Sequence, residues 1–287
     1  MNPSTVASSW RQLNIAFQDW TSAEDAAVTH VAPLLRAAEA DGLITSWFFV
    51  RKAPCWRLRY LPGADPARAT AQIHGGLSGL RGSDRIEDVR EVVYEPETRA
   101  FGGAEGMAAA HRLFHQDSRR LLDYLAESPR RLRTAHRREL SILLCSNLLR
   151  AAGLDWYEQG DVWARVAEHR EPPGDAPVGK LRAFEADLRR LMSVDTDQLV
   201  PDAVPTGFVI EWAEAFAATG RTLADLATGG LLHRGLRAIL AHHIIFTWNR
   251  HGVNYTAQAA LAHTAASVVL GNDPTAGHTA DRPDETS

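Results

Sequence analysis

Two arginines on a predicted strand are the residues of this chain most suited to binding an anion. Arg57 and Arg59 lie two positions apart, so their side chains point to the same face of the strand. Trp56, Leu58 and Tyr60 point to the opposite face, which we expect to be the core side. A cation on a half-buried strand is costly unless an anion accompanies it. The pair therefore predicts an anion clamp, while a solvated sheet face is the simpler alternative.

A third arginine lies where a loop often carries chemistry. Arg99 follows a predicted strand, just before the turn Gly102–Gly103. Backbone amides that are free in such a turn can bind an anion together with a guanidinium. Pairing of Arg99 with a neighbouring surface glutamate would leave it without a functional role.

Two pairs of histidines lie in helical patterns, where a histidine is more often a satisfied core group than a functional one. His242 and His243 lie in an apolar helical pattern, and adjacent helical positions point about 100° apart, so they face different surroundings. His111 and His115 have the spacing of a helical metal pair. No third ligand with telling spacing accompanies them, so we predict a structural role and no metal site.

The composition is that of an ordinary globular protein. The chain has 287 residues, 45% hydrophobic and 23% charged, with a formal net charge of −4, which favours neither nucleic acid nor an anionic membrane as a partner. Cys55 and Cys145 cannot form a disulfide framework, and no secretion signal or membrane-spanning run is evident. We therefore expect a cytoplasmic protein. Motifs for a nucleophile elbow, a P-loop or a dinucleotide site are absent from the sequence.

The N-terminal part predicts a sheet with helices on one face. Its alternating and helical hydrophobic patterns follow in the order strand, helix, strand, strand, helix, strand. That order is the split βαβ arrangement of a ferredoxin-like sheet, so residues 10–103 are predicted to be α+β. The six predicted elements span residues 10–18, 22–42, 43–51, 55–61, 65–80 and 86–95.

The C-terminal part, residues 104–270, predicts an all-helical layer that forms one integrated domain with the sheet. Residues 271–287, rich in Thr, Asp and Pro, are predicted to be a disordered tail. The predicted helices span residues 105–127, 131–152, 155–169, 178–192, 208–219, 231–250 and 255–270.

Four ordered motifs between residues 10 and 270 resemble the thiopeptide-type bacteriocin biosynthesis family, which includes the C-terminal elimination domain of class I lanthipeptide dehydratases. The motifs are WFFVR with WRLRY at 47–51 and 56–60, YEPE with FGG at 94–97 and 101–103, LFHQDS at 113–118 and HIIFTWNR at 243–250. Together they are far more specific than any one alone.

The resemblance implies a function. In the family, a glutamylation domain esterifies Ser or Thr of a precursor peptide with glutamate from glutamyl-tRNA, and the elimination domain removes that glutamate. The chain resembles the split form of this system, a lyase without cofactor or metal that works beside a separate glutamylating protein on a leader-bearing peptide. A related branch forms the pyridine ring of thiopeptides from two dehydroalanines, and a non-catalytic peptide-binding partner is a third reading. Whether the chain forms a homodimer stays open.

The resemblance also implies residue roles. Arg57 and Arg59 would bind the glutamyl group and Arg99 the same anion or the developing negative charge. His243 would transfer the proton, and His242 is the alternative if the helix is rotated so that His242 faces the site. The remaining substrate-binding residues would be Arg51, Lys52, Asn249 and Arg250.

Overall fold

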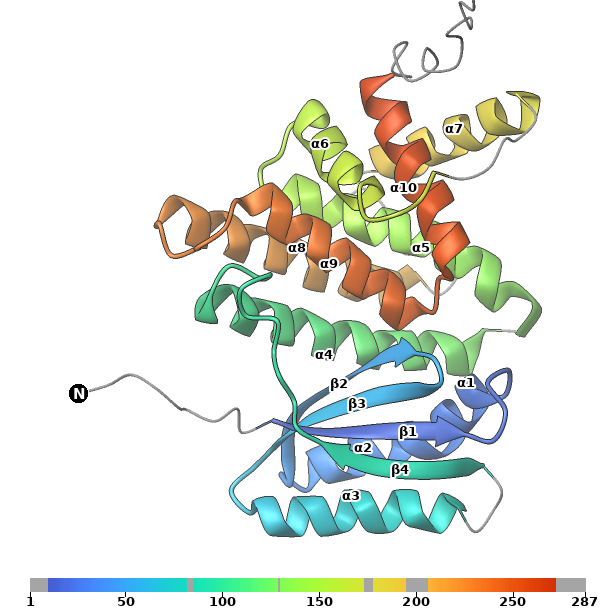
Figure 1. Cartoon of the computed structure of the whole chain (residues 1–287), viewed down its shortest axis with the longest axis vertical. Helices are drawn as coiled ribbons and strands as arrows, with labels where there is room; N and C mark the ends of the chain where they lie inside the picture. The colour runs from blue at the N-terminus through green and yellow to red at the C-terminus, as the bar shows by residue number, and fades with distance from the viewer. Residues whose placement is uncertain (1–9, 82–84, 129, 173–177, 195–205, 272–287) are drawn as a thin grey trace, which may run out of the picture.

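The computed structural model describes residues 10–81, 85–128, 130–172, 178–194 and 206–271. A four-stranded antiparallel sheet forms the N-terminal part and helices form the C-terminal part, which confirms the predicted α+β class (Figure 1). The predicted disordered tail, beyond Gly271, lies outside the described residues.

The sheet has the strand order β2-β3-β1-β4, with every neighbouring pair antiparallel. Its strands are β1 (Arg11–Phe17), β2 (Ile44–Lys52), β3 (Cys55–Pro62) and β4 (Ile86–Val92). This is the predicted ferredoxin-like order. The prediction that the last strand reaches residue 95 is wrong, because β4 pairs with β1 only as far as Val92 opposite Gln12, near the start of β1.

One face of the sheet is apolar and covered by helices. The cross-strand pairs Leu13–Leu58 and Ile15–Trp56 are buried on this face, as the alternating pattern predicts. The covering helices are α1 (Ala23–Ala26), the π-helical turn η1 (Ala27–Val31), α2 (Ala32–Ala40) and α3 (Pro66–Arg81). Residues 23–40, predicted as one helix, thus contain a π-helical turn.

Helix α4 (Ala104–Glu127) closes the β2 edge of the sheet, on the side of the helical layer (Figure 1). The Ser118 hydroxyl accepts a hydrogen bond of 3.3 Å from the Phe49 amide. The His115 Nδ1 atom lies 2.9 Å from the Trp47 carbonyl oxygen and 3.2 Å from its amide nitrogen. An edge strand presents backbone groups that need partners. Side chains of α4 supply them here.

The helical layer follows α4. It consists of α5 (Arg130–Ala151), α6 (Trp156–Ala167), α7 (Val178–Ser193), α8 (Thr206–Thr228), α9 (Leu236–His251) and α10 (Tyr255–Leu270). None of the helices in the described ranges is long and apolar enough to cross a lipid bilayer.

Two predicted helix boundaries in this layer are wrong. Helix α8 continues past residue 219 because Gly220 is a packing glycine: a Cβ there would lie 2.4 Å from the Leu148 carbonyl oxygen of α5. Helix α9 begins at Leu236 and not at 231, because the segment before it is hydrogen-bonded to the Gly102–Gly103 turn. The His233 amide donates to the Gly102 carbonyl at 2.8 Å.

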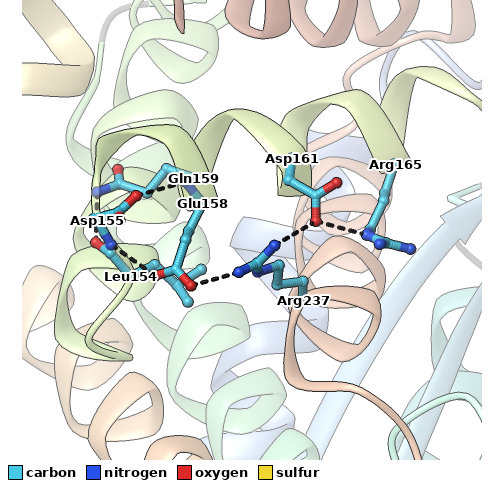
Figure 2. A network of polar contacts seen from close by, with 7 residues as sticks. All are labelled: Leu154, Asp155, Glu158, Gln159, Asp161, Arg165 and Arg237. Carbon is cyan, nitrogen blue, oxygen red and sulfur yellow. Dashed lines mark hydrogen bonds and ion pairs between the residues drawn. The ribbon is translucent and has the colours of Figure 1, made fainter. Parts of the chain in front are cut away.

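The start of α6 is fixed to α9 by a polar network (Figure 2). Asp155 caps α6 by accepting from the Glu158 amide at 2.8 Å, and Glu158 accepts from the Asp155 amide at 3.0 Å. Arg237 of α9 donates to Glu158 at 2.5 Å and to Asp161 at 3.3 Å. Glu158 therefore serves both the helix cap and the contact that positions α9.

A buried carboxylate joins α4, α8 and α9. Asp117 of α4 accepts hydrogen bonds from Arg250 Nε at 2.5 Å and from Trp212 Nε1 at 2.9 Å. The Nε2 atom of His251 lies 2.9 Å from Oδ1 of Asp117, the oxygen that also accepts from Trp212. The adjacent Arg250 guanidinium and His251 outweigh the effect of burial and lower the pKa of Asp117 to about 2.

Removing the Asp117 carboxylate should destabilise the protein strongly. In Asp117→Ala, the Arg250 guanidinium loses its buried counter-ion, which typically costs about 3–5 kcal/mol. Urea unfolding monitored by circular dichroism measures the change. Asp187→Ala is the matched control, because Asp187 pairs with Arg190 on the exposed side of α7 and should change stability little. Equal stability of the two variants would contradict this assignment.

Candidate functional site

Arg57 and Arg59 lie on the second face of the sheet, as predicted. They pair across the ladder with Asn14 and Gln12 of β1, while Leu58 between them points to the opposite, apolar face. We call the group formed by Gln12, Arg57, Arg59, Tyr94, Glu97 and His111 the arginine face.

Arg59 is held by aromatic rings and an amide. Its side chain is buried, its Nε donates to Gln12 Oε1 at 2.7 Å, and its Cζ lies 4.5 Å from the centre of the Tyr94 ring. Burial lowers the pKa of Arg59, and nearby Tyr94 and Glu97 oppose that shift. The Nη1 atom is enclosed and has no hydrogen-bond partner among the described residues.

Arg57 brings a second charge to the same face. It is half-buried, and its enclosed Nε also lacks a partner within the part of the chain that the structure describes. The two guanidiniums are close enough for Arg57 to lower the pKa of Arg59. Glu97 supplies a nearby carboxylate, yet its Oε2 is enclosed and unpaired in the described ranges. The face therefore holds donors that a bound carboxylate could satisfy.

Tyr94 and His111 form a neutral pair beside Arg59. The Tyr94 hydroxyl lies 2.9 Å from His111 Nε2. Burial raises the pKa of Tyr94, while burial and the charge of Arg59 lower the pKa of His111 to about 4. At neutral pH both groups are therefore uncharged, and the hydrogen bond joins a neutral phenol to a neutral imidazole. The sequence reading did not assign Gln12, Tyr94, Glu97 or His111 to a site, although Tyr94 and Glu97 lie in a quoted motif.

Arg99 lines a neighbouring pocket. Its side chain is exposed, and the pocket of about 700 Å³ also contains Glu97, His233 and Arg234. Arg234 fixes the loop by donating from Nη1 to the Ala100 carbonyl at 3.1 Å. Glu97 lines this pocket and also interacts with Arg59, so it connects Arg99 with the arginine face.

The two adjacent histidines of α9 have different surroundings. His243 is fully buried, with its ring centre 5.0 Å from that of Phe101 and 6.0 Å from that of Phe114, and neither ring nitrogen has a partner among the described residues. His242 is half-buried and lies 3.1 Å from the Ala238 carbonyl through Nδ1 and 3.5 Å from Arg234 Nη1. His242 is therefore the one beside the Arg99 pocket.

The predicted substrate-binding residues do not form one group. Arg250 is buried on Asp117, and its Cζ lies 4.4 Å from the centre of the Phe114 ring. Lys52 is exposed at the end of β2. Arg51 and Asn249 line a second cleft, between the β2–β3 turn and the helical layer.

A comparison with protein families decides the identity of the chain. Residues 10–269 match the model of the lantibiotic biosynthesis dehydratase C-terminal domain. The chain belongs to this family. No curated protein sequence matches it.

Solved structures share the fold of this dehydratase C-terminal domain. The tRNA-dependent lantibiotic dehydratase MibB from Microbispora sp. 107891 is 16% identical with a TM-score of 0.68, over 94% of this chain and 29% of MibB. TsrL is 18% identical with a TM-score of 0.62, over 92% of this chain and 99% of TsrL. TbtD, the pyridine synthase from thiomuracin biosynthesis, is 14% identical with a TM-score of 0.52, over 91% and 97% of the two chains.

The burial of His243 should make stability depend on pH. Burial and the charge of Arg250 lower its pKa to about 3, so the folded protein keeps it neutral while the unfolded chain takes up a proton below roughly pH 6.5. Stability is therefore full above the unfolded pKa and falls as the pH falls towards 3. In His243→Leu this contribution disappears. The loss of unfolding free energy between pH 7 and 5, measured by urea titration, should shrink by about 2 kcal/mol. An unchanged loss would contradict the buried, neutral state.

Proposed function

We propose that this dehydratase C-terminal domain removes glutamate from glutamylated Ser or Thr side chains of a ribosomal precursor peptide, leaving dehydroalanine or dehydrobutyrine. Membership of the dehydratase C-terminal family supports a lyase-type enzyme. The identity of the substrate, a glutamyl ester on a precursor peptide, is the part that we propose.

One observation carries the proposal. Arg57 Nε and Arg59 Nη1 are both enclosed and lack a partner among the described residues, on one face of one strand. Buried guanidinium nitrogens without partners are costly, and a carboxylate supplies two acceptor oxygens to such donors. Glutamate offers a carboxylate in the bound ester and leaves as one after the reaction.

The elimination needs a proton acceptor and a stabilised leaving group. A base takes the proton from Cα of the modified residue. The electron pair forms the Cα–Cβ double bond, and the Cβ–O bond breaks with its pair leaving on the glutamate carboxylate. We assign the departing negative charge to Arg57 and Arg59.

We assign the proton transfer to Glu97 in place of His243. The Glu97 carboxylate lies on the arginine face with an unpaired oxygen, whereas His243 is enclosed by aromatic rings. His243 and Arg250 would then hold α9 in position and not touch substrate. The exposed Arg99, on the same loop as Glu97, would attract the glutamyl anion into the site.

The proposal implies two partners. The peptide substrate is the first, and a protein that installs the glutamyl ester is the second, since elimination requires the ester. The split arrangement, in which this second protein is a separate chain, is part of the proposal.

Pyridine-ring formation from two dehydroalanines is a second candidate. TbtD is named a pyridine synthase, and the match spans 97% of its length. In favour of this candidate, Arg99 and His243 stand apart from the arginine face, so only Arg57 and Arg59 of the four expected groups meet there. The substrate of this reaction carries no glutamate for the two arginines to bind.

Arg57→Ala should slow elimination strongly. We expect the rate to fall by about 10²-fold or more, because the variant lacks a cation that stabilises the departing charge. A synthetic peptide with a glutamyl ester on Ser is incubated with the protein, and mass spectrometry follows the loss of glutamate. Arg90→Ala is the matched control, since Arg90 is an exposed arginine on the edge strand β4, separated from Arg57 by strand β1 and paired with Asp88.

Three outcomes separate the candidates. Loss of activity in Arg57→Ala, with activity retained in Arg90→Ala, supports elimination at the arginine face. Equal activity in both variants contradicts the assignment of Arg57. A peptide that wild-type protein leaves unchanged argues for ring formation or for a non-catalytic peptide-binding partner.

Glu97→Gln should lower kcat and leave KM nearly unchanged. The amide keeps the shape of the side chain but cannot accept the Cα proton, so we expect kcat to fall by about 10²- to 10⁴-fold. Steady-state kinetics with the same ester peptide measures both constants. A rise in KM at constant kcat would instead make Glu97 a substrate-binding group.

A further inference from the structure

A second basic cleft lies between the β2–β3 turn and the helical layer. It has a volume of about 680 Å³ and is open to solvent at Ala53 and Tyr255. Its charged and aromatic lining residues are Trp20, Glu24, Arg51, Trp56, Arg137, Arg170 and Tyr255. They come from five separate segments, so the folded chain alone creates the site.

Arg51 is built into the wall of this cleft. Its side chain is 6% exposed and its Cζ lies 4.5 Å from the centre of the Trp56 ring. Gly252 backs the guanidinium, since a Cβ there would lie 2.9 Å from Arg51 Nη1. A ring and a glycine therefore fix the plane of the group.

Two of the three guanidinium nitrogens of Arg51 have no hydrogen-bond partner among the described residues. Nη1 pairs with Glu24, whereas Nε and Nη2 are enclosed and have no hydrogen-bond partner in the described ranges. These two nitrogens lie on one edge of the planar fork and can donate in parallel to the two oxygens of a carboxylate. Burying them without a partner is costly, which favours a ligand at this position.

The cleft carries more positive than negative charge. Glu24 is shared by Arg51 and Arg137, which lies 2.5 Å from the same carboxylate oxygen, so one negative charge faces two positive ones. Arg170 adds a third cation, held by Gln258 at 3.1 Å through its Nε. An anion is attracted here although the whole chain has a net charge of −4.

We propose that this cleft binds an acidic side chain of the peptide substrate, at a position other than the residue that reacts. This inference rests on the proposed function, which supplies the peptide. Arg51 pairs with Trp56 in the β2–β3 ladder, one step from the pair Val50–Arg57, so the cleft lies at the same hairpin as the arginine face but on the opposite side of the sheet, and a peptide would reach both around the end of the hairpin. Trp20 and Tyr255, each about half exposed at 45% and 53%, offer rings to neighbouring peptide residues.

Direct binding in the Arg57→Ala background tests the proposal, because that variant weakens the arginine face as a competing carboxylate site. The probes are the peptides acetyl-Phe-Glu-Phe-amide and acetyl-Phe-Gln-Phe-amide, titrated by saturation-transfer NMR. We expect the Glu peptide to bind about tenfold or more tightly than the Gln peptide, and Arg51→Met to remove that preference. Equal binding of the two peptides would overturn the proposal.

A second variant guards against misfolding of Arg51→Met. Ala53 is exposed at the mouth of the cleft, so Ala53→Glu adds a competing carboxylate without disturbing the buried wall. It should weaken the Glu peptide about tenfold, whereas the matched Ala53→Gln should not. Inorganic phosphate that displaces the Glu peptide far better than acetate does would assign the cleft to phosphate and overturn the carboxylate. The elimination proposal is tested separately, by the ester-peptide assay of Arg57→Ala. A negative result in the binding titration therefore contradicts the cleft proposal and not the elimination.

Discussion

The Asp117 carboxylate is the interaction on which the arrangement of the two layers depends. It lies on α4 between His115 and Ser118, which contact the backbone of β2, and it accepts from Arg250 and Trp212 of the helical layer. One turn of α4 thus holds the sheet on one side and α8 and α9 on the other. The motif LFHQDS at 113–118 therefore connects the sheet to the helical layer, and the contacts of its residues are structural.

Three arginines of this chain are removed from water in different ways. Arg250 is paired with a buried carboxylate and stacked on Phe114, so its place is structural. Arg59 and Arg51 also rest on aromatic rings, Arg51 pairs with Glu24, and both guanidiniums have enclosed nitrogens without a partner among the described residues. Rings stabilise a cation but leave its donors free. Arg250 also keeps an enclosed Nη1 without a partner in the described ranges, so what sets it apart is the fully buried carboxylate of Asp117 as its counter-ion.

The sequence predicted the sheet well because period-two patterning decides which face of a strand is buried. It placed Arg57 and Arg59 on one face and Leu58 on the other, and the ladder confirms this. It could not place Arg250, because a buried ion pair depends on Asp117, 133 positions away in the chain. The prediction that this helix ends at residue 219 is wrong for a similar reason, since the contact of Gly220 with α5 is not visible in the local sequence pattern.

The histidine pair shows where the sequence leaves two alternatives and the tertiary structure separates them. Adjacent helical residues point in different directions, so one histidine of the pair must differ from the other in its surroundings. Phe101 and Phe114 enclose His243, and desolvation in that cage lowers its pKa to about 3, which makes it a poor proton acceptor at neutral pH. A base for the proposed elimination is better sought on the arginine face. There Glu97 lies close enough to Arg59 for the two charges to interact, so the group that would take the proton and the group that would take the departing charge share one surface.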